Sequence, residues 1–263
     1  MTSRRTGLVD CDGERIYWEV AGDGGDAVAL CHGMGGNHAS WWQQVPDLAR
    51  DHRVLTWDQR GFGNSTARTG EVGPTPSVGD LTAVMEAAGI DDAHIVGQSM
   101  GGWVAMGWAL AHPDRVRSLI LTDTLAGVMT DEIGRLTAEA AKGLSFVADT
   151  LGEHPALGRR LVDGDPTHAY LYQLISSFGD RPPDGELFRR LGETRYPLDS
   201  VRAIAAPTLL IVGEHDPLCP PAAMRIIADL VPGARLEVIP GCGHSPYFED
   251  TAAWNRIVRT ALS

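Results

Sequence analysis

Short runs of apolar residues alternate along the chain with longer segments in which apolar residues recur at helical spacing. This alternation predicts an α/β protein whose strands form a mostly parallel sheet covered by helices. The predicted strands cover residues 16–20, 27–31, 53–57, 93–97, 117–123, 207–213 and 236–239. In such sheets, ligands bind beyond the carboxyl ends of the strands, so polar residues that directly follow strands are the candidates for a functional site.

Capping residues and prolines set the limits of the predicted helices. Ser40 begins a capping-box pattern, and Ser77 is the predicted cap of the next helix, which ends at Gly89. Pro113 prevents the third helix from extending further. Outside the middle of the chain, the predicted helices cover residues 40–50, 77–89, 100–111, 220–230 and the segment that begins at Ser245.

The alternation stops between residues 125 and 200, where the pattern is helical and contains no strong strand. Thr130 is the predicted cap of one helix, residues 165–179 form a second, and residues 184–191 form a third. We therefore expect one core domain, made of residues 1–124 and 201–263, with a helical cap of residues 125–200 inserted after the sixth strand. This cap, or lid, should lie over the carboxyl edge of the sheet.

Composition narrows the classes of function. The 263 residues include 43% hydrophobic and 21% charged residues, which is typical of a globular protein large enough for a deep core. A formal net charge of -12 argues against nucleic acid and anionic membrane surfaces as partners. Lys142 is the only lysine, which disfavours Schiff-base chemistry.

Four scattered cysteines lack disulfide or zinc spacing, and no membrane-length apolar run or export signal is recognised. We therefore expect free thiols and a cytoplasmic protein, present as a monomer or homodimer.

The most informative motif is Gly97-Gln-Ser-Met-Gly101, which reads G-x-S-x-G between an apolar strand and a helix of small residues. A serine on such a sharp turn is held in a strained conformation with its hydroxyl exposed at the edge of the sheet. Glycines two residues before and after Ser99 keep the backbone crossing free of side chains. The motif predicts a serine nucleophile, which requires a base, an acid and an oxyanion site elsewhere in the chain.

His244, in a glycine-rich loop after the last strand, is the candidate general base. Asp216 follows the strand at 207–213 and is the candidate acid that orients the imidazole. Asp123 competes for this role because it also ends a strand and could reach the same histidine. The order Ser99, Asp216, His244 is one of the known chain orders of this triad.

Two backbone N–H groups near Ser99 should form the oxyanion hole. Met100 supplies one at the start of its helix, and Met34, in the turn that follows residues 27–31, is the candidate for the other. His32 and His38 lack clustered metal-ligand spacing, and no phosphate loop or dinucleotide fingerprint occurs, so we expect no metal and no cofactor. Candidate substrate contacts, several of which could instead be packing residues, are Gly33, Trp41, Trp103, Tyr170 and Phe178.

Together these motifs resemble the α/β-hydrolase superfamily, and more narrowly its small bacterial esterase, enol-lactonase and C–C-bond hydrolase branch. The resemblance rests on His32-Gly33-x-Gly-Gly, Asp58-Gln-Arg-Gly-Phe-Gly-Asn-Ser65, Gly97-Gln-Ser-Met-Gly-Gly102, Gly213-Glu-His-Asp216 and Gly243-His244. It implies an eight-stranded sheet with one antiparallel strand, a helical lid and no cofactor. It also implies that Asp216, rather than Asp123, is the acid of the triad.

The expected activity is hydrolysis of a small carboxylic ester or lactone through an acyl-enzyme on Ser99, with water as the second substrate. The same triad also serves C–C bond hydrolysis, acyl transfer and cofactor-free perhydrolysis, and Arg60 is the one cation singled out near Ser99 that could stabilise a carbanion. A small-molecule receptor that keeps the fold and the triad is a further alternative. The lid segment, which shapes the pocket, contains no recognised motif.

Overall fold

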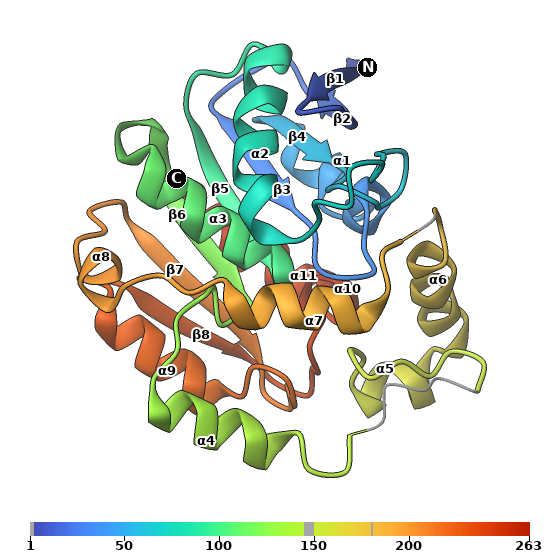
Figure 1. The fold of residues 1–263 in the computed structure, drawn as a ribbon. Helices are drawn as coiled ribbons and strands as arrows, with labels where there is room; N and C mark the ends of the chain where they lie inside the picture. Colours follow the sequence, from blue (N-terminus) through green and yellow to red (C-terminus); the bar gives the residue numbers. More distant parts are fainter. Residues whose placement is uncertain (1–2, 145–149, 180) are drawn as a thin grey trace.

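The computed structural model describes residues 3–144, 150–179 and 181–263 (Figure 1). Within these ranges eight strands form one sheet in the order β1-β2-β4-β3-β5-β6-β7-β8. β2 pairs antiparallel with both β1 and β4, whereas the other neighbours pair parallel, so β2 alone runs against the rest. The strands are β1 (Arg4–Cys11), β2 (Glu14–Ala21), β3 (Ala27–Cys31), β4 (Arg53–Trp57), β5 (Ala93–Gln98), β6 (Val116–Thr122), β7 (Thr208–Gly213) and β8 (Arg235–Ile239).

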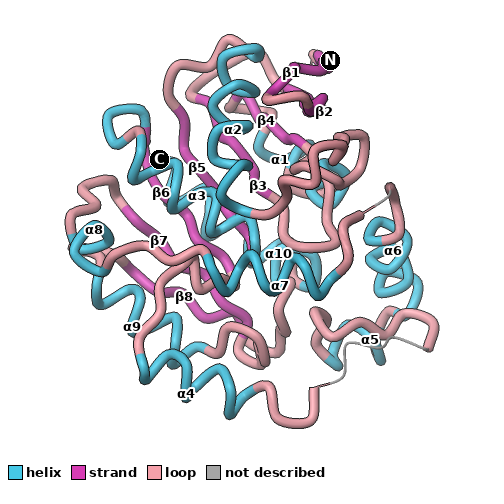
Figure 2. Tube along the Cα trace, viewed as in Figure 1, coloured by secondary structure: helices cyan, strands magenta, loops and turns pink. Residues whose placement is uncertain are grey.

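Helices cover both faces of this sheet, and the middle strands lie between them, whereas β1 and β2 lie at one edge of the sheet (Figure 2). In the described part of the chain the helices are α1 (Val45–Leu48), α2 (Pro74–Ala88), α3 (Met100–Ala111), α4 (Asp131–Ala140), α5 (Arg159–Gly164), α6 (Pro166–Ser176), α7 (Asp184–Glu193), α8 (Leu198–Arg202), α9 (Pro221–Leu230), α10 (Pro246–Glu249) and α11 (Thr251–Leu262). Short 3-10 helices add His38–Trp41 and Pro113–Arg115. Every described helix is too short or too polar to cross a membrane.

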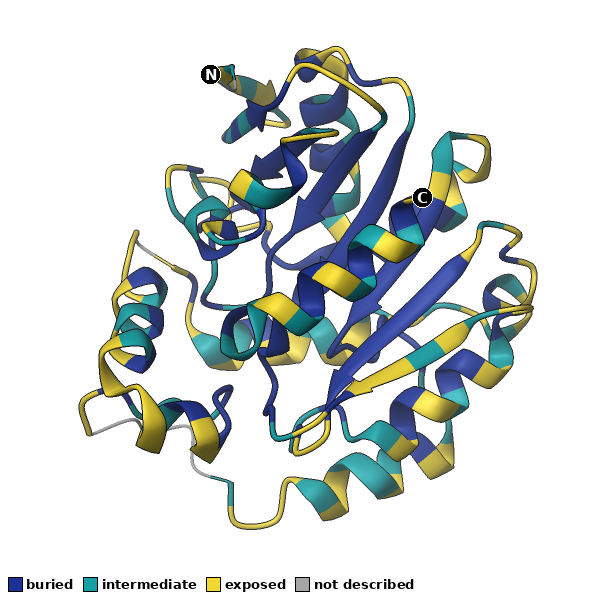
Figure 3. Cartoon of the chain, turned by 180° about the vertical axis from the view of Figure 1, so that it is seen from behind, coloured by how far each residue is buried: buried dark blue, intermediate teal, exposed yellow. Residues whose placement is uncertain are grey.

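Strand β3 illustrates how the sheet divides the core into two layers. Its side chains alternate between the two faces, as the pleat of a strand requires. Ala29 and Cys31 pack in the layer that contains α2, α3 and α9. Val28 and Leu30 pack in the layer that contains α1 and α11. The central strands are therefore buried on both faces, while the flanking helices expose their outer sides (Figure 3).

The sequence prediction found seven of the eight strands to within about two residues at each end, but it missed β1. This edge strand is largely exposed, and its sequence Arg-Arg-Thr-Gly-Leu-Val-Asp-Cys has little apolar alternation. β1 is held by eight paired positions on β2, so tertiary pairing rather than local pattern defines it. The expected sheet of eight strands with one antiparallel strand is confirmed.

Three helix predictions were wrong in their details. The helix predicted at 40–50 is a 3-10 turn followed by the short α1, and its cap is Asn37, whose side chain accepts the Ala39 N–H. Helix α2 begins at Pro74 rather than after Ser77, because proline is well suited to the first helical position. The terminal helix is divided into α10 and α11.

In the lid segment the predicted caps are present, but two short helices were missed. Thr130 accepts the Ile133 N–H at the start of α4, and Asp165 caps α6 in the same manner. α6 ends at Ser176, three residues earlier than predicted, and α5 and α8 were not predicted. Residues 145–149 and 180 of this segment lie outside the described residues, and the division into core and lid stays a prediction.

Candidate active site

Ser99 occupies the single-residue turn between β5 and α3. Its backbone has φ 49° and ψ -121°, a conformation that side-chain-bearing residues rarely adopt. The glycines on either side are required by space: a Cβ at Gly97 would lie 2.7 Å from Ala105 Cβ, and one at Gly101 would overlap the Cys31 carbonyl oxygen. The strand-turn-helix context predicted for the motif is therefore present.

His244 and Asp216 lie next to this turn, although they are far from it in sequence. His244 Nε2 is 2.9 Å from Ser99 Oγ, and His244 Nδ1 is 2.8 Å from Asp216 Oδ2. His244 and Asp216 are both buried, with 4% and 3% of their surface exposed. The His244 carbonyl oxygen accepts a hydrogen bond from Gln98 Nε2, which ties the histidine loop to the end of β5. The three predicted residues thus form one continuous hydrogen-bonded chain.

Asp216 is held as a carboxylate by its surroundings. Its Oδ1 accepts the backbone N–H groups of Leu218 at 2.8 Å and Cys219 at 3.0 Å, which leaves Oδ2 to face His244. Burial alone would raise the pKa of Asp216, but the interactions with His244 and these N–H groups outweigh it and lower the pKa below its usual value. Asp216 can therefore orient the imidazole and stabilise its cation.

Asp123, the competing acid, is buried beside Asp216 rather than against the imidazole. Its Oδ1 accepts the Gly213 N–H at 2.9 Å and its Oδ2 accepts the Thr122 hydroxyl at 2.7 Å. Burial and the neighbouring Asp216 carboxylate hold the pKa of Asp123 well above its usual value. Within the described residues no hydrogen bond joins Asp123 to His244, so the geometry favours Asp216 for the acid role.

The candidate oxyanion donors lie on two sides of Ser99. Met100 is the first residue of α3, and the N–H groups of the first helical turn have no partner within the helix. Met34 lines the cavity beside Ser99, and in the described part of the chain no acceptor takes its N–H. Gly33 brings this turn close, because a Cβ there would overlap Gln98 Oε1 and lie 3.0 Å from Ser99 Cβ.

Buried polar contacts support the two loops beside the site. His32 Nε2 accepts the Gln59 N–H at 3.0 Å, and its Nδ1 lies 2.8 Å from the Gly33 carbonyl oxygen. Arg60 is bound by Asp80 through Nε at 2.7 Å and Nη2 at 2.8 Å. Arg60 does not line the cavity beside Ser99, so its place in the structure is a supporting one.

A cavity of about 80 Å³ opens beside the serine. It is formed by strand-end residues and by residues of the lid segment, which come together only in the folded chain. The lining residues are Met34, Gln98, Ser99, His154, Pro155, Ala156, Tyr172, Arg181, Asp184, Leu218 and His244.

None of the five residues predicted as substrate contacts lines this cavity, although Gly33 lies in the turn beside Ser99. Trp41 is fully buried and packs against Tyr247 with ring centroids 4.8 Å apart, so it belongs to the core. The Trp103 indole is buried and donates to the Thr194 carbonyl oxygen. Tyr170 and Phe178 are exposed on the outside of the lid.

The residues of the lid segment that line the cavity were not predicted from the sequence. Only Tyr172 could have been identified from the sequence, by the helical spacing of buried residues. Ala169, Tyr172 and Ile175 are the buried positions of α6 and recur every three residues, which is the spacing of one helix face. This periodicity selects Tyr172 over Tyr170 as the inward-facing aromatic residue. His154, Arg181 and Asp184 precede or begin helices and have no such pattern.

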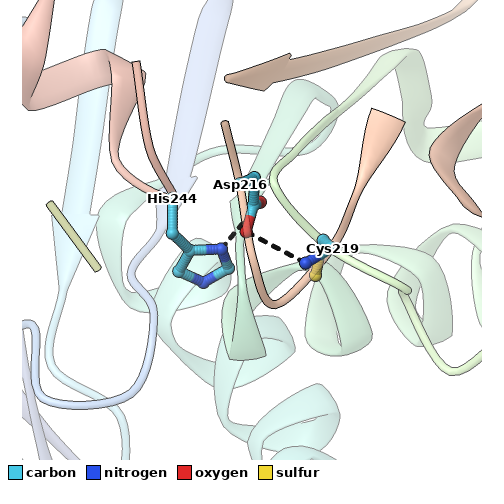
Figure 4. A group of neighbouring side chains, drawn as sticks. All are labelled: Asp216, Cys219 and His244. Atoms are coloured by element: carbon cyan, nitrogen blue, oxygen red, sulfur yellow. Dashed lines mark hydrogen bonds and ion pairs between the residues drawn. The ribbon is translucent and has the colours of Figure 1, made fainter. Parts of the chain in front are cut away.

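Asp216, Cys219 and His244 also form a compact group whose ligand-type atoms lie within 4.8 Å of one another (Figure 4). A metal would need the thiolate of Cys219. Burial, together with the carboxylates of Asp216 and Asp123, holds the pKa of this thiol well above its usual value. The donor set therefore fits a hydrogen-bonded acid–base pair better than a metal site.

Comparison with known proteins defines the class. The family model described as the alpha/beta hydrolase fold matches residues 26–142 and 159–251, and the chain belongs to this family of hydrolases. A thermophilic esterase from Thermogutta terrifontis shares 27% identity and a TM-score of 0.77, covering 100% of this chain and 98% of that one.

Among sequence relatives, a 2-hydroxy-6-oxononadienedioate/2-hydroxy-6-oxononatrienedioate hydrolase from Klebsiella pneumoniae is 30% identical over 95% of this chain and 91% of its own. A proline iminopeptidase from Lactobacillus delbrueckii subsp. bulgaricus is 28% identical, over 93% and 92%. The names of these relatives give different substrates, so the family membership leaves the substrate open.

Proposed function

We propose that this protein is a serine hydrolase that cleaves a small carboxylic ester or lactone through an acyl-enzyme on Ser99. The observation that carries the proposal is the hydrogen-bonded chain from Ser99 Oγ through His244 to Asp216 Oδ2, with distances of 2.9 Å and 2.8 Å. A hydroxyl is a weak nucleophile at neutral pH unless an adjacent base accepts its proton. His244 is placed for this role, and Asp216 keeps the proton of the neutral ring on Nδ1.

In the proposed mechanism, Ser99 Oγ attacks the scissile carbonyl while its proton moves to His244 Nε2. The N–H groups of Met34 and Met100 stabilise the oxyanion, and each is expected to contribute about 2.7–4 kcal/mol to the transition state. His244 then protonates the leaving alkoxide, and the ester bond breaks. In the second half-reaction, water attacks the acyl-enzyme while His244 accepts its proton. His244 then returns a proton to Ser99 Oγ as the acyl bond breaks, which releases the acid and free Ser99.

Arg60, the cation considered for carbanion stabilisation, is held by Asp80 and does not line the cavity, whereas Arg181 does. The ester or lactone interpretation is preferred on the similarity to the Thermogutta terrifontis esterase. The four cysteines are free thiols, in keeping with our proposal of a cytoplasmic enzyme, and monomer or homodimer stays a prediction.

Replacing Ser99 by alanine tests the nucleophile. Ser99→Ala should reduce hydrolysis of 4-nitrophenyl acetate and butyrate to background and abolish labelling by a fluorophosphonate, while circular dichroism and thermal unfolding stay close to wild type. Ser118→Ala is the matched control, because Ser118 Oγ also lies 2.8 Å from a histidine ring nitrogen, that of His94, but mid-strand in β6. Retained turnover in Ser99→Ala, or label on another residue, would overturn the proposal.

A substrate panel then separates the alternatives. Steady turnover of esters or lactones with release of the free acid supports hydrolysis. Preferential transfer of the acyl group to an added alcohol or to hydrogen peroxide would instead indicate acyl transfer or perhydrolysis. Binding without turnover would indicate a receptor.

A further inference from the structure

His154 presents a hydrogen-bond donor in the cavity beside Ser99. Its Nδ1 accepts the Ala156 N–H at 3.1 Å, so the proton of the neutral ring is on Nε2. Burial, together with the neighbouring Arg181 and His244, lowers the pKa of His154 to about 4. The ring is therefore neutral at physiological pH, and its Nε2–H can donate to an oxygen of a bound molecule.

Arg181 contributes a guanidinium to the same cavity. One terminal nitrogen of this guanidinium, Arg181 Nη2, donates a hydrogen bond to the Asp184 carboxylate at 3.1 Å. The other terminal nitrogen, Arg181 Nη1, lies beside the loop that carries Met34, since a Cβ at Gly35 would lie 3.1 Å from it. Among the described residues, none accepts a hydrogen bond from Nη1. Asp184 thus anchors the guanidinium while leaving one of its edges available.

Resting on the proposed function, we propose that the substrate carries a carboxylate in addition to the scissile carbonyl, and that Arg181 and His154 bind it. The planar guanidinium matches a carboxylate in geometry and charge, and a charge-assisted hydrogen bond is stronger than a neutral one. The Nε2–H of His154, which also lines this cavity, adds a second donor. A small cavity with these two donors near Ser99 selects short half-esters of dicarboxylic acids, or lactones that bear a carboxylate.

The electrostatic surroundings of His154 agree with this assignment. Arg181 and His244 are the neighbours that favour the neutral form of its ring. Asp184, which lines the same cavity, is paired with Arg181 and is not among the groups that shift the pKa of His154. The space near His154 therefore faces a positive group, and an anionic substrate group would be stabilised there.

The test compares matched pairs of ethyl esters that differ in a terminal carboxylate. The monoethyl esters of succinic, glutaric and adipic acids are compared with ethyl butyrate, pentanoate and hexanoate, and kcat/KM is measured from ethanol release. The measured quantity is the ratio of kcat/KM for the acidic ester to that for its neutral partner. Wild type should show a ratio of at least about ten at one chain length, since one charge-assisted contact contributes about 1.5–3 kcal/mol.

Arg181→Met should lower this ratio at least tenfold, and Arg181→Lys should retain part of it because the charge is kept. His154→Phe, which keeps an aromatic ring but removes the donor, should lower the ratio by a smaller factor. Arg189→Met is the matched control: Arg189 is in the same lid segment, paired with Glu186 and Glu193, and lines no part of the cavity. Its ratio should equal that of wild type.

The possible failures can be told apart. If neutral esters are hydrolysed in a Ser99-dependent manner but the wild-type ratio is near or below one, the carboxylate proposal is wrong and the proposed function stands. The same conclusion follows if Arg181→Met keeps the wild-type ratio, or if Arg189→Met lowers it equally. If neither kind of ester nor any lactone is hydrolysed through Ser99, the proposed function itself is wrong.

Discussion

Replacing Asp216 by asparagine is the sharpest test of the proposed acid. The substitution keeps the shape of the side chain, and the local hydrogen bonds determine how the amide must sit. The N–H groups of Leu218 and Cys219 both donate to Oδ1, so the amide oxygen has to take that position. The amide nitrogen then faces His244 Nδ1 in place of Oδ2. A donor at this place forces the imidazole proton onto Nε2, which faces Ser99.

The expected loss follows from this tautomer. A His244 ring with its proton on Nε2 cannot accept the Ser99 proton, and loss of the carboxylate removes the stabilisation of the imidazolium. The same substitution in a Ser-His-Asp triad costs about 10⁴-fold in kcat, which is about 5.5 kcal/mol at about 1.4 kcal/mol per factor of ten. We therefore expect Asp216→Asn to lose about 10³- to 10⁴-fold in kcat, with the fold retained.

Asp123→Asn is the matched control, because Asp123 is a buried carboxyl beside Asp216. The pKa of Asp123 is held well above its usual value, so its acid form is favoured, and a neutral amide resembles that form. We expect less than about a tenfold loss, measured as kcat for the best ester of the panel. The reverse result, a severe loss in Asp123→Asn and near-normal kcat in Asp216→Asn, would refute the assignment of the acid.

Two further predictions concern the loop before Ser99. Gly33→Ala should reduce kcat/KM by about 10²-fold, because the new Cβ would displace Gln98 and the nearby oxyanion turn. Gly24→Ala is the control, since a Cβ at Gly24 meets nothing within 4 Å and kcat/KM should stay at the wild-type value. Equal kcat/KM in the two variants would contradict this account. Burial lowers the pKa of His32 from 6.5 to about 4, so the unfolded chain binds the proton more readily and stability should fall as the pH decreases from 6.5 to 4. His32 should account for on the order of 3 kcal/mol of this loss. Urea unfolding across that pH range should show that the free energy of unfolding depends less steeply on pH in His32→Asn than in wild type. Parallel curves for the two proteins would contradict the assignment to His32.

The predicted site residues that the structure brings together are those with a strong local signal in the sequence. Ser99 is marked by two glycines that the backbone crossing needs, and a buried apolar strand precedes it. Asp216 and His244 follow strands of one sheet, and the carboxyl ends of parallel strands meet at one edge. The resemblance to the family already favoured Asp216 over Asp123, although both follow buried strands. The hydrogen bonds of the structure favour the same residue, because Asp216 contacts His244 and Asp123 accepts the Gly213 N–H.

The lid residues could not be predicted because their positions depend on contacts between segments without a regular pattern. His154 precedes α5 and Arg181 precedes α7, so neither has helical periodicity to indicate its direction. Trp41 had an aromatic side chain near the site in sequence, yet its ring packs against Tyr247 and Trp254 in the core. Aromatic character alone therefore selected packing residues, whereas Tyr172 could have been selected from the spacing of the buried face of α6.

The residues proposed to carry out the reaction and those proposed to select the substrate lie in different parts of the chain. The hydrogen bonds that join Ser99, His244 and Asp216 involve only residues that follow β5, β7 and β8. In contrast, His154 is fixed by Ala156 and Arg181 by Asp184, which are neighbours in the lid segment itself. A substitution at Arg181 should therefore change which ester is preferred without disturbing the hydrogen-bonded triad. We therefore expect that substitutions in the lid segment can change the substrate preference while the contacts among Ser99, His244 and Asp216 stay the same.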